Sequence, residues 1–266
     1  MKTKYVSIIA MIGFALILSS CSDSSTNPTP SNDYFPVTAG SYFVYNNIRL
    51  DSTTGNRDMT ALQVDSLVVL AATNKENKTA YPFDVYRLNQ KIRTDYYAKD
   101  GQTVWGFWKY IPPGITLSEL INTIVPQNYR WSKFADFAAT GEWTIADTTI
   151  TGLSIPFNGQ NIPLSSNINM KGKKIGTTTE TINGNTFPNT TQFELTVTLK
   201  PSITIFGNVF PIDPIPVKQT IWVAKSVGIV KEEFPSLDLK VLVPGLEPIT
   251  YKGDGYVKEL LRYSVK

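Results

Sequence analysis

Short apolar runs that alternate with polar residues and end in turn residues constrain this chain more than any other feature. In Gln192–Lys200, four apolar side chains alternate with polar ones. A period of two is typical of a strand that buries one face. Asp100-Gly101 and Asn183-Gly184 each separate two such runs, and pairs of this kind favour tight hairpin turns. The pattern therefore predicts a mainly β protein built from antiparallel hairpins.

Apolar alternation and turn residues together predict strands over most of the chain after Asp33. The predicted strands are Tyr42–Leu50, Leu62–Ala72, Phe83–Leu88, Arg93–Ala98, Thr103–Tyr110, Glu142–Thr151, Leu153–Phe157, Ile162–Leu164, Asn167–Ile175, Gln192–Lys200, Ile203–Phe206, Val209–Ile212, Val217–Ala224, Ile229–Phe234, Leu237–Val243 and Tyr256–Val265. Pro211–Pro216 is rich in proline, which predicts a stiff loop or a sheet edge. No change in composition divides residues 34–266. We therefore expect one large antiparallel domain, built as a curved sheet, a half-barrel or a sandwich.

One segment departs from the strand pattern and predicts a short amphipathic helix inserted in the β domain. In Thr116–Val125, apolar residues recur at the spacing of one helix face, and Pro126 ends the segment. Thr116 and Glu119 have the spacing of a capping box. A further helical turn or two is expected around Ser132–Ala139, where aromatic and alanine side chains share one side.

The first 20 residues have the organisation of a cleaved signal peptide. Lys2 and Lys4 give a positive start, and Val6–Leu18 gives a mostly apolar stretch of the usual length. As a helix, this stretch would be about 20 Å long. The hydrocarbon core of a bilayer is about 30 Å thick, so a permanent transmembrane anchor is the weaker interpretation.

The end of this segment matches a lipobox, the motif that directs cysteine acylation in bacterial lipoproteins. Its residues are Leu18, Ser19, Ser20 and Cys21, and Cys21 is the one cysteine of the chain. The alternative is an ordinary secretory signal whose cysteine lies near the cleavage site by chance. On the lipobox interpretation, Cys21 becomes the mature N-terminus and carries two or three acyl chains. That number of chains holds a protein stably on a membrane.

The residues after Cys21 predict a disordered tether. Ser22–Asp33 contains no aliphatic or aromatic side chain, so burial cannot offset the entropy of ordering it. Fully extended, the segment would reach about 40 Å. We therefore divide the chain into a signal peptide at 1–20, a lipidated cysteine with its tether at 21–33, and a globular domain at 34–266. A loop packed against the domain is the alternative for the tether.

Composition excludes several classes of function. Histidine is absent, which removes Ser-His-Asp and Cys-His hydrolase chemistry and the usual ligands of zinc, iron and copper. Of 25 basic residues, Lys2 and Lys4 belong to the signal peptide, which leaves 23 against 22 acidic ones. The mature chain also lacks the basic runs of a nucleic-acid-binding surface. We therefore expect a non-enzymatic protein with no cofactor, no metal site and no nucleic-acid partner.

One aromatic segment is a candidate ligand contact. In a strand, Trp105 and Phe107 face one side, while Trp108 and Tyr110 face the other. One of these sides could line a groove for an apolar or sugar ligand. The alternative is that one side belongs to the core and the other lies under the predicted helix.

Carboxylates are the remaining candidates for catalysis. Glu232 and Glu233 are adjacent in a predicted strand, so their side chains point to opposite faces. Other acidic residues are scattered along the chain, among them Asp95, Glu142, Asp147 and Asp213. A glycosidase would need two carboxylates within about 5–10 Å of each other. We expect these residues to be solvated surface groups instead.

Two segments resemble uncharacterised envelope lipoproteins of Bacteroidota and related phyla. Tyr34-Phe35-Pro36-Val37, with the segment Gly40–Tyr45, is similar to the opening of their domain, and Trp222–Lys231 is similar to a hairpin near its end. Ser22 and Asp23 also resemble an export signal of surface lipoproteins. The resemblance implies a location in the cell envelope, with the outer membrane favoured over the inner one. It brings no activity that could be carried onto residues of this chain.

These observations leave three functional hypotheses. The first is an envelope protein that is attached to the membrane through the lipid on Cys21 and binds a lipid or other apolar ligand. The second is a structural or interaction protein that recognises a protein or a glycan. The third and weakest is a glycosidase that uses carboxylates.

The lipobox generates a direct test. We expect Cys21→Ala to abolish incorporation of a labelled fatty acid and to release the protein from the membrane fraction, because the thiol is the site of acyl attachment. Metabolic labelling followed by fractionation measures both effects. Ser20→Ala, which keeps a small residue before the cysteine, should retain the label. Labelled Cys21→Ala protein would contradict the prediction.

Overall fold

The structure is a computed structural model that describes residues 33–109, 128–157, 160–205, 207–241 and 249–266. The predicted signal peptide, the lipobox with Cys21, most of the predicted tether, Tyr110 and the predicted helix Thr116–Val125 lie outside these residues. All regular elements in the described part are strands, which confirms the mainly β prediction. None of the described segments forms a helix with the length and apolarity needed to cross a membrane.

The strands and their bounds are β1 (Tyr42–Leu50), β2 (Arg57–Val69), β3 (Thr73–Lys75), β4 (Lys78–Arg87), β5 (Gln90–Asp100), β6 (Thr103–Trp108), β7 (Arg130–Asp136), β8 (Trp143–Phe157), β9 (Gln160–Ile182), β10 (Asn185–Ile205), β11 (Asn208–Pro211), β12 (Ile215–Ala224), β13 (Gly228–Phe234), β14 (Leu237–Val241), β15 (Ile249–Gly253) and β16 (Gly255–Ser264). Most of them match predicted strands, and β1 has the predicted bounds. The long strands β9 and β10 each merge segments that the sequence predicts as separate. The short strands β3 and β15 were not predicted.

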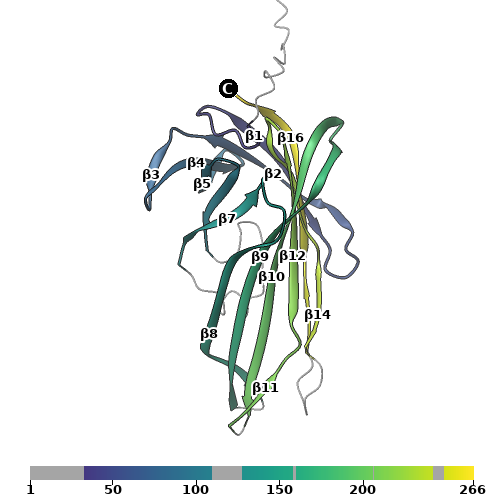
Figure 1. Cartoon of the computed structure of the whole chain (residues 1–266). Coiled ribbons are helices and arrows are strands. Elements are labelled where there is room, and N and C mark those ends of the chain that lie inside the picture. The colour runs from purple at the N-terminus through teal and green to yellow at the C-terminus, as the bar shows by residue number, and fades with distance from the viewer. Residues whose placement is uncertain (1–32, 110–127, 158–159, 206, 242–248) are drawn as a thin grey trace, which may run out of the picture.

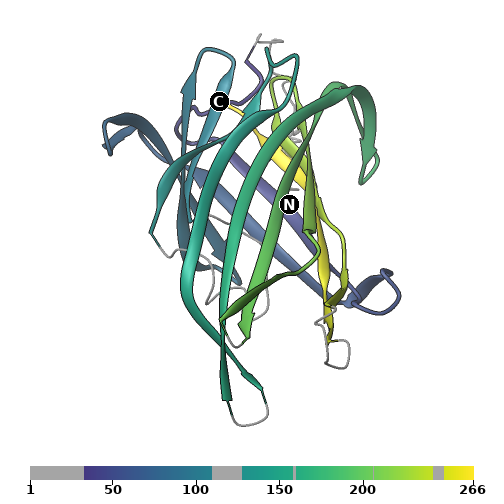
Figure 2. The ribbon, with the colours of Figure 1, turned by 60° about the horizontal axis from the view of Figure 1, so that its bottom comes forward.

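Fourteen of these strands form one antiparallel sheet in the order β7-β6-β5-β4-β2-β1-β16-β13-β12-β10-β9-β8, with β3 on β4 and β11 on β10. Its two halves meet where β1 pairs with β16 over the whole length of β1. The sheet curls until its end strands β7 and β8 lie close together, so it forms a nearly closed cylinder (Figures 1 and 2). This confirms the curved antiparallel sheet, and within the described residues no second sheet packs face to face on it as a sandwich requires.

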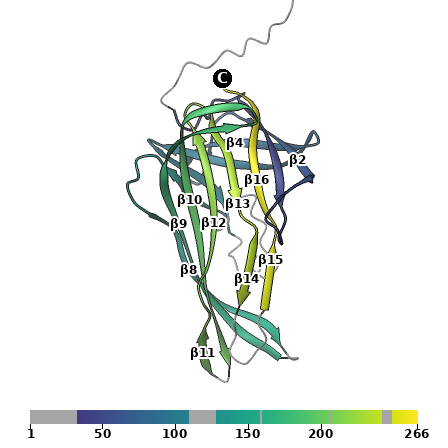
Figure 3. The same cartoon turned by 90° about the vertical axis from the view of Figure 1, so that its right-hand side faces the viewer.

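The remaining two strands, β14 and β15, pair with each other and continue the paired strands β13 and β16 (Figure 3). Phe234 pairs with Tyr256 in the main sheet, and Leu237 pairs with Gly253 in the extension. At the junction, a Cβ on Gly255 would lie 2.3 Å from the carbonyl oxygen of Phe234. Only glycine fits this close backbone approach.

Side chains, and not a backbone ladder, hold the seam between β7 and β8. The indole nitrogen of Trp143 donates to the carbonyl of Lys133 at 3.1 Å. The Arg130 guanidinium donates to the carbonyl of Ile145, and the Lys174 ammonium donates to that of Phe137 at 2.7 Å. The Trp143 ring lies against Gly172, where a Cβ would be 2.3 Å from it. The seam thus depends on one tryptophan that folds flat over a glycine.

The helical turns expected at Ser132–Ala139 are wrong. Residues 130–136 form β7, which pairs with β6. Phe134, which is only 1% exposed, points into the cylinder and packs on Tyr97 and Trp108 at ring-centroid distances of 5.8 and 5.5 Å. Pairing with β6 and burial of this ring outweigh the weak local helical pattern.

Aromatic side chains fill one end of the cylinder, and the segment that precedes β1 supplies one of them. The Phe35 ring lies 5.1 Å from Tyr97, 5.8 Å from Phe134 and 6.0 Å from Phe83, measured between centroids. Phe35 is 4% exposed. Its backbone nitrogen also donates to the Asp33 carboxylate at 2.9 Å. The residues just before the first strand therefore form a plug, which we define as residues 33–36.

The plug generates a stability prediction. We expect Phe35→Ala to lower the free energy of unfolding by about 3–5 kcal/mol, because it removes a buried ring from a packed aromatic cluster. Urea denaturation measures this change. The matched control is Tyr42→Ala, which removes an aromatic side chain that is 41% exposed and should cost about 0.5 kcal/mol or less. Equal losses of unfolding free energy in the two variants would show that the Phe35 ring does not stabilise the aromatic end of the cylinder.

Candidate functional site

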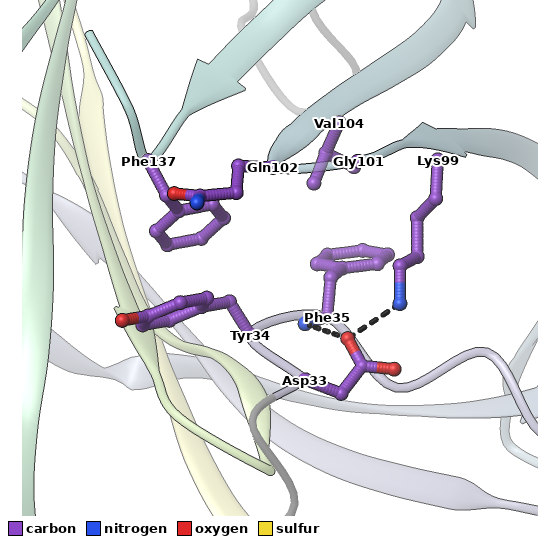
Figure 4. Close-up of a pocket in the computed structure, with 8 residues that line it drawn as sticks. All are labelled: Asp33, Tyr34, Phe35, Lys99, Gly101, Gln102, Val104 and Phe137. Atoms are coloured by element: carbon purple, nitrogen blue, oxygen red, sulfur yellow. Dashed lines mark hydrogen bonds and ion pairs between the residues drawn. The ribbon is translucent and has the colours of Figure 1, made fainter.

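The plugged mouth of the cylinder contains a cavity lined by residues of the described part of the chain. Its volume is about 490 Å³, and it lies between the plug and the β5–β6 hairpin (Figure 4). Tyr34 stacks on Phe137 with ring centroids 4.3 Å apart, and the Asp33 carboxylate pairs with Lys99. The backbone nitrogen of Ser226 also donates to the Asp33 carbonyl at 2.7 Å. These contacts secure the plug from both sides of the mouth.

The second cavity lies at the opposite end of β1 and β16 and is strongly charged. Its volume is about 480 Å³. The charged side chains that line it are Arg49, Arg87, Arg93, Lys258, Asp65, Glu232 and Asp254. We call this space the charged cavity. It contrasts with the aromatic end, where the space among Phe35, Phe43 and Phe83 is only about 20 Å³.

Strand alternation explains how one face supplies both ends. On β1, Phe43 and Tyr45 point into the aromatic end, while Asn47 and Arg49, on the same face, line the charged cavity. On β2, Leu67 contacts both regions, and Asp65 lines the charged one. The inward face of each strand thus changes from apolar to charged along its length.

The central feature of the charged cavity is a buried ion pair across two paired strands. Glu232 on β13 lies directly opposite Lys258 on β16. The Lys258 nitrogen is 3.0 Å from Glu232 Oε1, and the two side chains are 14% and 9% exposed. The Lys258 ammonium also lies 4.4 Å from the centre of the Tyr45 ring. The lysine is therefore held by a carboxylate and by an aromatic face.

Two further ion pairs border the same space. The Arg87 guanidinium makes two hydrogen bonds to the Asp65 carboxylate, at 2.7 and 2.9 Å. Arg93 Nε lies 3.0 Å from Asp95 Oδ1, and the Asp95 side chain is 11% exposed. The planar two-point pairing with Asp65 fixes the orientation of the Arg87 guanidinium.

Three buried tyrosines surround the Glu232 carboxylate. Burial raises the pKa of Tyr45 and Tyr256 well above 10, and the negative charge of Glu232 adds to the effect. Burial also raises the pKa of Tyr97, followed by the charges of Asp95 and Glu232. The Tyr45 hydroxyl donates to the carbonyl of Ile229 at 2.8 Å, and the Tyr256 hydroxyl accepts from Gln219 at 2.8 Å. These hydroxyls stay neutral at physiological pH.

A smaller chamber lies deeper in the cylinder and shares Arg93, Glu232 and Lys258 with the charged cavity. We call it the inner chamber, and its volume is about 30 Å³. Gln219 and Trp108 line it and are 3% and 6% exposed. Within the described residues, Gln219 Oε1 and Trp108 Nε1 are buried without a hydrogen-bond partner. Both atoms have almost no accessible surface, so they are closed off from the space of the chamber.

The structure places the predicted aromatic residues in two different environments. Trp105 and Phe107 lie on the outer face of β6, beneath lysines of the β3–β4 hairpin. The Lys78 nitrogen is 4.5 Å from the Trp105 ring centre, and the Lys75 nitrogen is 4.6 Å from that of Phe107. Trp108 points inward, as alternation predicts, and lines the inner chamber.

The expectation that the carboxylates are solvated is wrong for Glu232 and Asp95, which line the inner chamber. Glu233 does face outward, where it pairs with Lys231 at 2.8 Å, so the prediction of opposite faces is confirmed. The other candidates lie elsewhere: Glu142 pairs with Lys171, Asp147 accepts from Asn167 and Asn169, and Asp213 is exposed. Asp95 and Glu232 of the predicted set share the inner chamber.

Arg93, Lys258 and Gln219 were not predicted as site residues. The sequence does contain a signal for Glu232, the ion-pair partner of Lys258. Glu232 lies two residues before Phe234, so both side chains are on one face of β13. Phe234 is fully buried, and a carboxylate on such a face requires a buried partner. The partner strand could not be identified without the pairing of β13 with β16.

Comparison with known proteins finds only distant structural likeness. No protein-family model matches the chain, and no curated protein matches it. A candidate lipoprotein from Parabacteroides distasonis is 12% identical, with 89% of this chain and 100% of that chain covered and a TM-score of 0.44. A candidate exported protein with a YmcC-like fold from Bacteroides fragilis is 9% identical, with 88% and 100% covered and a TM-score of 0.40. Likeness at this level carries no argument about function.

The buried ion pair generates a prediction with a built-in control. We expect Glu232→Gln to lower the free energy of unfolding by about 3 kcal/mol, because it leaves the Lys258 charge buried without its partner. Glu233→Gln breaks an exposed pair one residue away and should cost less than about 1 kcal/mol. Urea denaturation compares the two variants. The double variant Glu232→Gln with Lys258→Met should recover part of the loss, and a double variant less stable than Glu232→Gln alone would contradict this account.

Proposed function

We propose that this protein is a lipid-anchored, non-enzymatic protein of the bacterial cell envelope that binds a small polar ligand in its charged cavity. The lipobox at Leu18–Cys21 supports the anchor, and Ser22 after the cysteine favours the outer membrane over the inner one. The observation that carries the binding role is the charged cavity with its ion pairs.

Cavity size and polarity favour a polar ligand over the apolar one expected from the sequence. The volume of about 480 Å³ falls within the range of about 300–1,000 Å³ typical of small-molecule sites. The space among the aromatic rings of Phe35, Phe43 and Phe83 is only about 20 Å³, which is too small for an apolar ligand. A wholly apolar molecule in the charged cavity would remove water from the ion pairs without replacing its hydrogen bonds, which is unfavourable.

The same geometry favours binding over catalysis. Asp95 and Glu232 share the inner chamber, but each carboxylate already lies 3.0 Å from a basic group, Arg93 or Lys258. Carboxylates that are held in ion pairs in this way are suited to the recognition of a charged ligand. Recognition of a protein or glycan on the outer surface is the alternative function.

The plug supports an orientation for the site relative to the membrane. The chain enters the cylinder at residues 33–36, on the side away from the charged cavity. With Cys21 anchored, the twelve residues from Ser22 to Asp33 would connect the membrane to the plugged mouth. The charged cavity would then open away from the lipid surface, where it is accessible to soluble molecules.

Native mass spectrometry of the full-length lipidated protein, extracted from the envelope in mild detergent, tests the proposal. We expect a small non-covalent adduct on the wild type and on the Glu233→Gln control. The double variant Glu232→Gln with Lys258→Met should lose the adduct while remaining folded by circular dichroism, because it removes charge from the cavity without leaving an unpaired group. Absence of any adduct from the wild type, or its full retention in the double variant, would overturn the proposal.

A further inference from the structure

We propose that the seam between β7 and β8 is a lateral gate, which opens to connect the charged cavity with the outer surface of the cylinder. The role of the gate as an entrance rests on the proposed binding function, whereas its opening does not. Four observations carry the inference: the missing strand pairing, the latch that replaces it, the unequal ends of the seam, and the chamber behind it.

The first observation is that two consecutive strands meet at the seam without pairing. β7 ends at Asp136 and β8 begins at Trp143, and strands joined by so short a connection usually lie paired side by side. In the described residues, however, β7 pairs with β6 and β8 with β9, and no backbone hydrogen bond joins β7 to β8. Separation of β7 from β8 therefore breaks side-chain bonds and leaves both neighbouring ladders intact.

The second observation is that one tryptophan side chain forms the latch of the seam. The indole nitrogen of Trp143 on β8 donates to the carbonyl of Lys133 on β7 at 3.1 Å. Its ring lies over Gly172, the residue that pairs with Trp143 on β9. Because glycine has no side chain, the ring meets a flat backbone surface on that side. The latch can therefore be released by movement of a single side chain.

The third observation is that the two ends of the seam are fixed unequally. At the mouth, residues 137–142 connect β7 to β8, the Phe137 nitrogen donates to the carbonyl of Gln102 at 3.0 Å, and the Phe137 ring stacks on Tyr34. At the other end of β7, the Arg130 guanidinium donates to the carbonyl of Ile145. The mouth end is therefore the hinge, and the gate opens from the Arg130 end.

The fourth observation is that the inner chamber borders the movable strand. Phe134 on β7 and Trp108 on β6 line this chamber, with ring centroids 5.5 Å apart. The chamber shares Arg93, Glu232 and Lys258 with the charged cavity. When β7 moves away from β8, Phe134 moves with it, and the chamber opens on that side. The gate thus provides a second route to the charged cavity.

Hydrogen exchange at the Trp143 indole N–H, followed by nuclear magnetic resonance on the full-length protein in detergent micelles, tests the opening. This proton is bonded across the seam, so it exchanges when the gate opens, whereas the bonded amides of the β6–β7 and β8–β9 ladders exchange only when those strands separate. We expect its protection factor to be at least about tenfold lower than those of the ladder amides. Equal protection would overturn the gate.

Two variants loosen the seam, and each has a reference. Gly172→Ala places a Cβ 2.3 Å from the Trp143 ring and displaces it, while Gly176→Ala on the same strand meets no atom within 4 Å and is the matched control. Arg130→Met removes the bond at the far end with little change in side-chain length. We expect Gly172→Ala and Arg130→Met each to lower the protection of the Trp143 proton by about tenfold or more. The ladder amides and the Trp131 indole, which donates outside the seam, should not change.

The outcomes of these variants decide whether the seam is a gate. If Gly172→Ala also unfolds the ladders, Arg130→Met decides alone. Protection in both variants equal to that in Gly176→Ala would overturn the proposal, because the seam contacts would then not control the opening.

The role of the gate as an entrance has a separate readout. Native mass spectrometry measures how fast the extracted protein loses its non-covalent adduct into buffer. The loss should be faster in Arg130→Met than in the wild type or Gly176→Ala, by about the same factor as the indole exchange. Equal rates of loss would overturn the entrance. Absence of any adduct would overturn the proposed function and the entrance with it, while indole exchange still decides whether the seam opens.

Discussion

The first and last strands of the domain are hydrogen-bonded to each other, with Tyr42 opposite Ser264 and Leu50 opposite Gly255. Every other feature of the cylinder depends on this pairing. From it, the N-terminal half of the sheet extends in one direction to β7, and the C-terminal half extends in the other direction to β8. The same pairing brings Arg49 and Lys258 to one end of the interior, although they are about 200 residues apart in the chain. The charged cavity exists because strands β1 and β16 are paired.

The interior combines two kinds of packing that are normally kept apart. Phe35, Phe83 and Phe134 form an aromatic cluster, while Glu232 and Lys258, which lie on other strands, form an ion pair in the same interior. A buried ion pair rarely adds stability compared with apolar residues of the same size, because both charges lose their hydration. Stability therefore does not explain why charges occupy these positions. Recognition of a ligand does, since it needs charges that are fixed in place and shielded from bulk water.

The sequence predicts the local structure well and the closure of the sheet not at all. The alternation in Gln192–Lys200 and the Asn183-Gly184 turn are local signals, and the structure has a strand and a turn there. β9 and β10 are longer than predicted because pairing between neighbours extends strands through stretches with weak alternation, such as the threonine-rich residues 177–181. The opposite orientation of Glu232 and Glu233 follows from strand geometry. Phe234, two residues after Glu232, indicates which of the two faces inward, but the strand that supplies the partner of Glu232 depends on the pairing of β13 with β16.

The candidate site illustrates the same division between local and long-range information. Trp108 was predicted to be a ligand contact from its aromatic segment, and it lines the inner chamber, whereas Trp105 and Phe107 lie outside under Lys78 and Lys75. Gln219, Arg93 and Lys258 come from three strands that are distant in sequence. Their convergence is a property of the strand order, so it could not be predicted from composition or spacing.

The side-chain seam between β7 and β8 gives the cylinder an unusual mechanical property. Elsewhere, widening the cylinder would break a continuous row of backbone hydrogen bonds, but at the seam it requires only that Trp143 slide off Gly172 and that a few side-chain contacts release. Local opening follows the route with the fewest bonds to break. The interior volume is therefore adjustable at one place on the wall, and the diameter of the cylinder can change while all of its strand pairings remain intact.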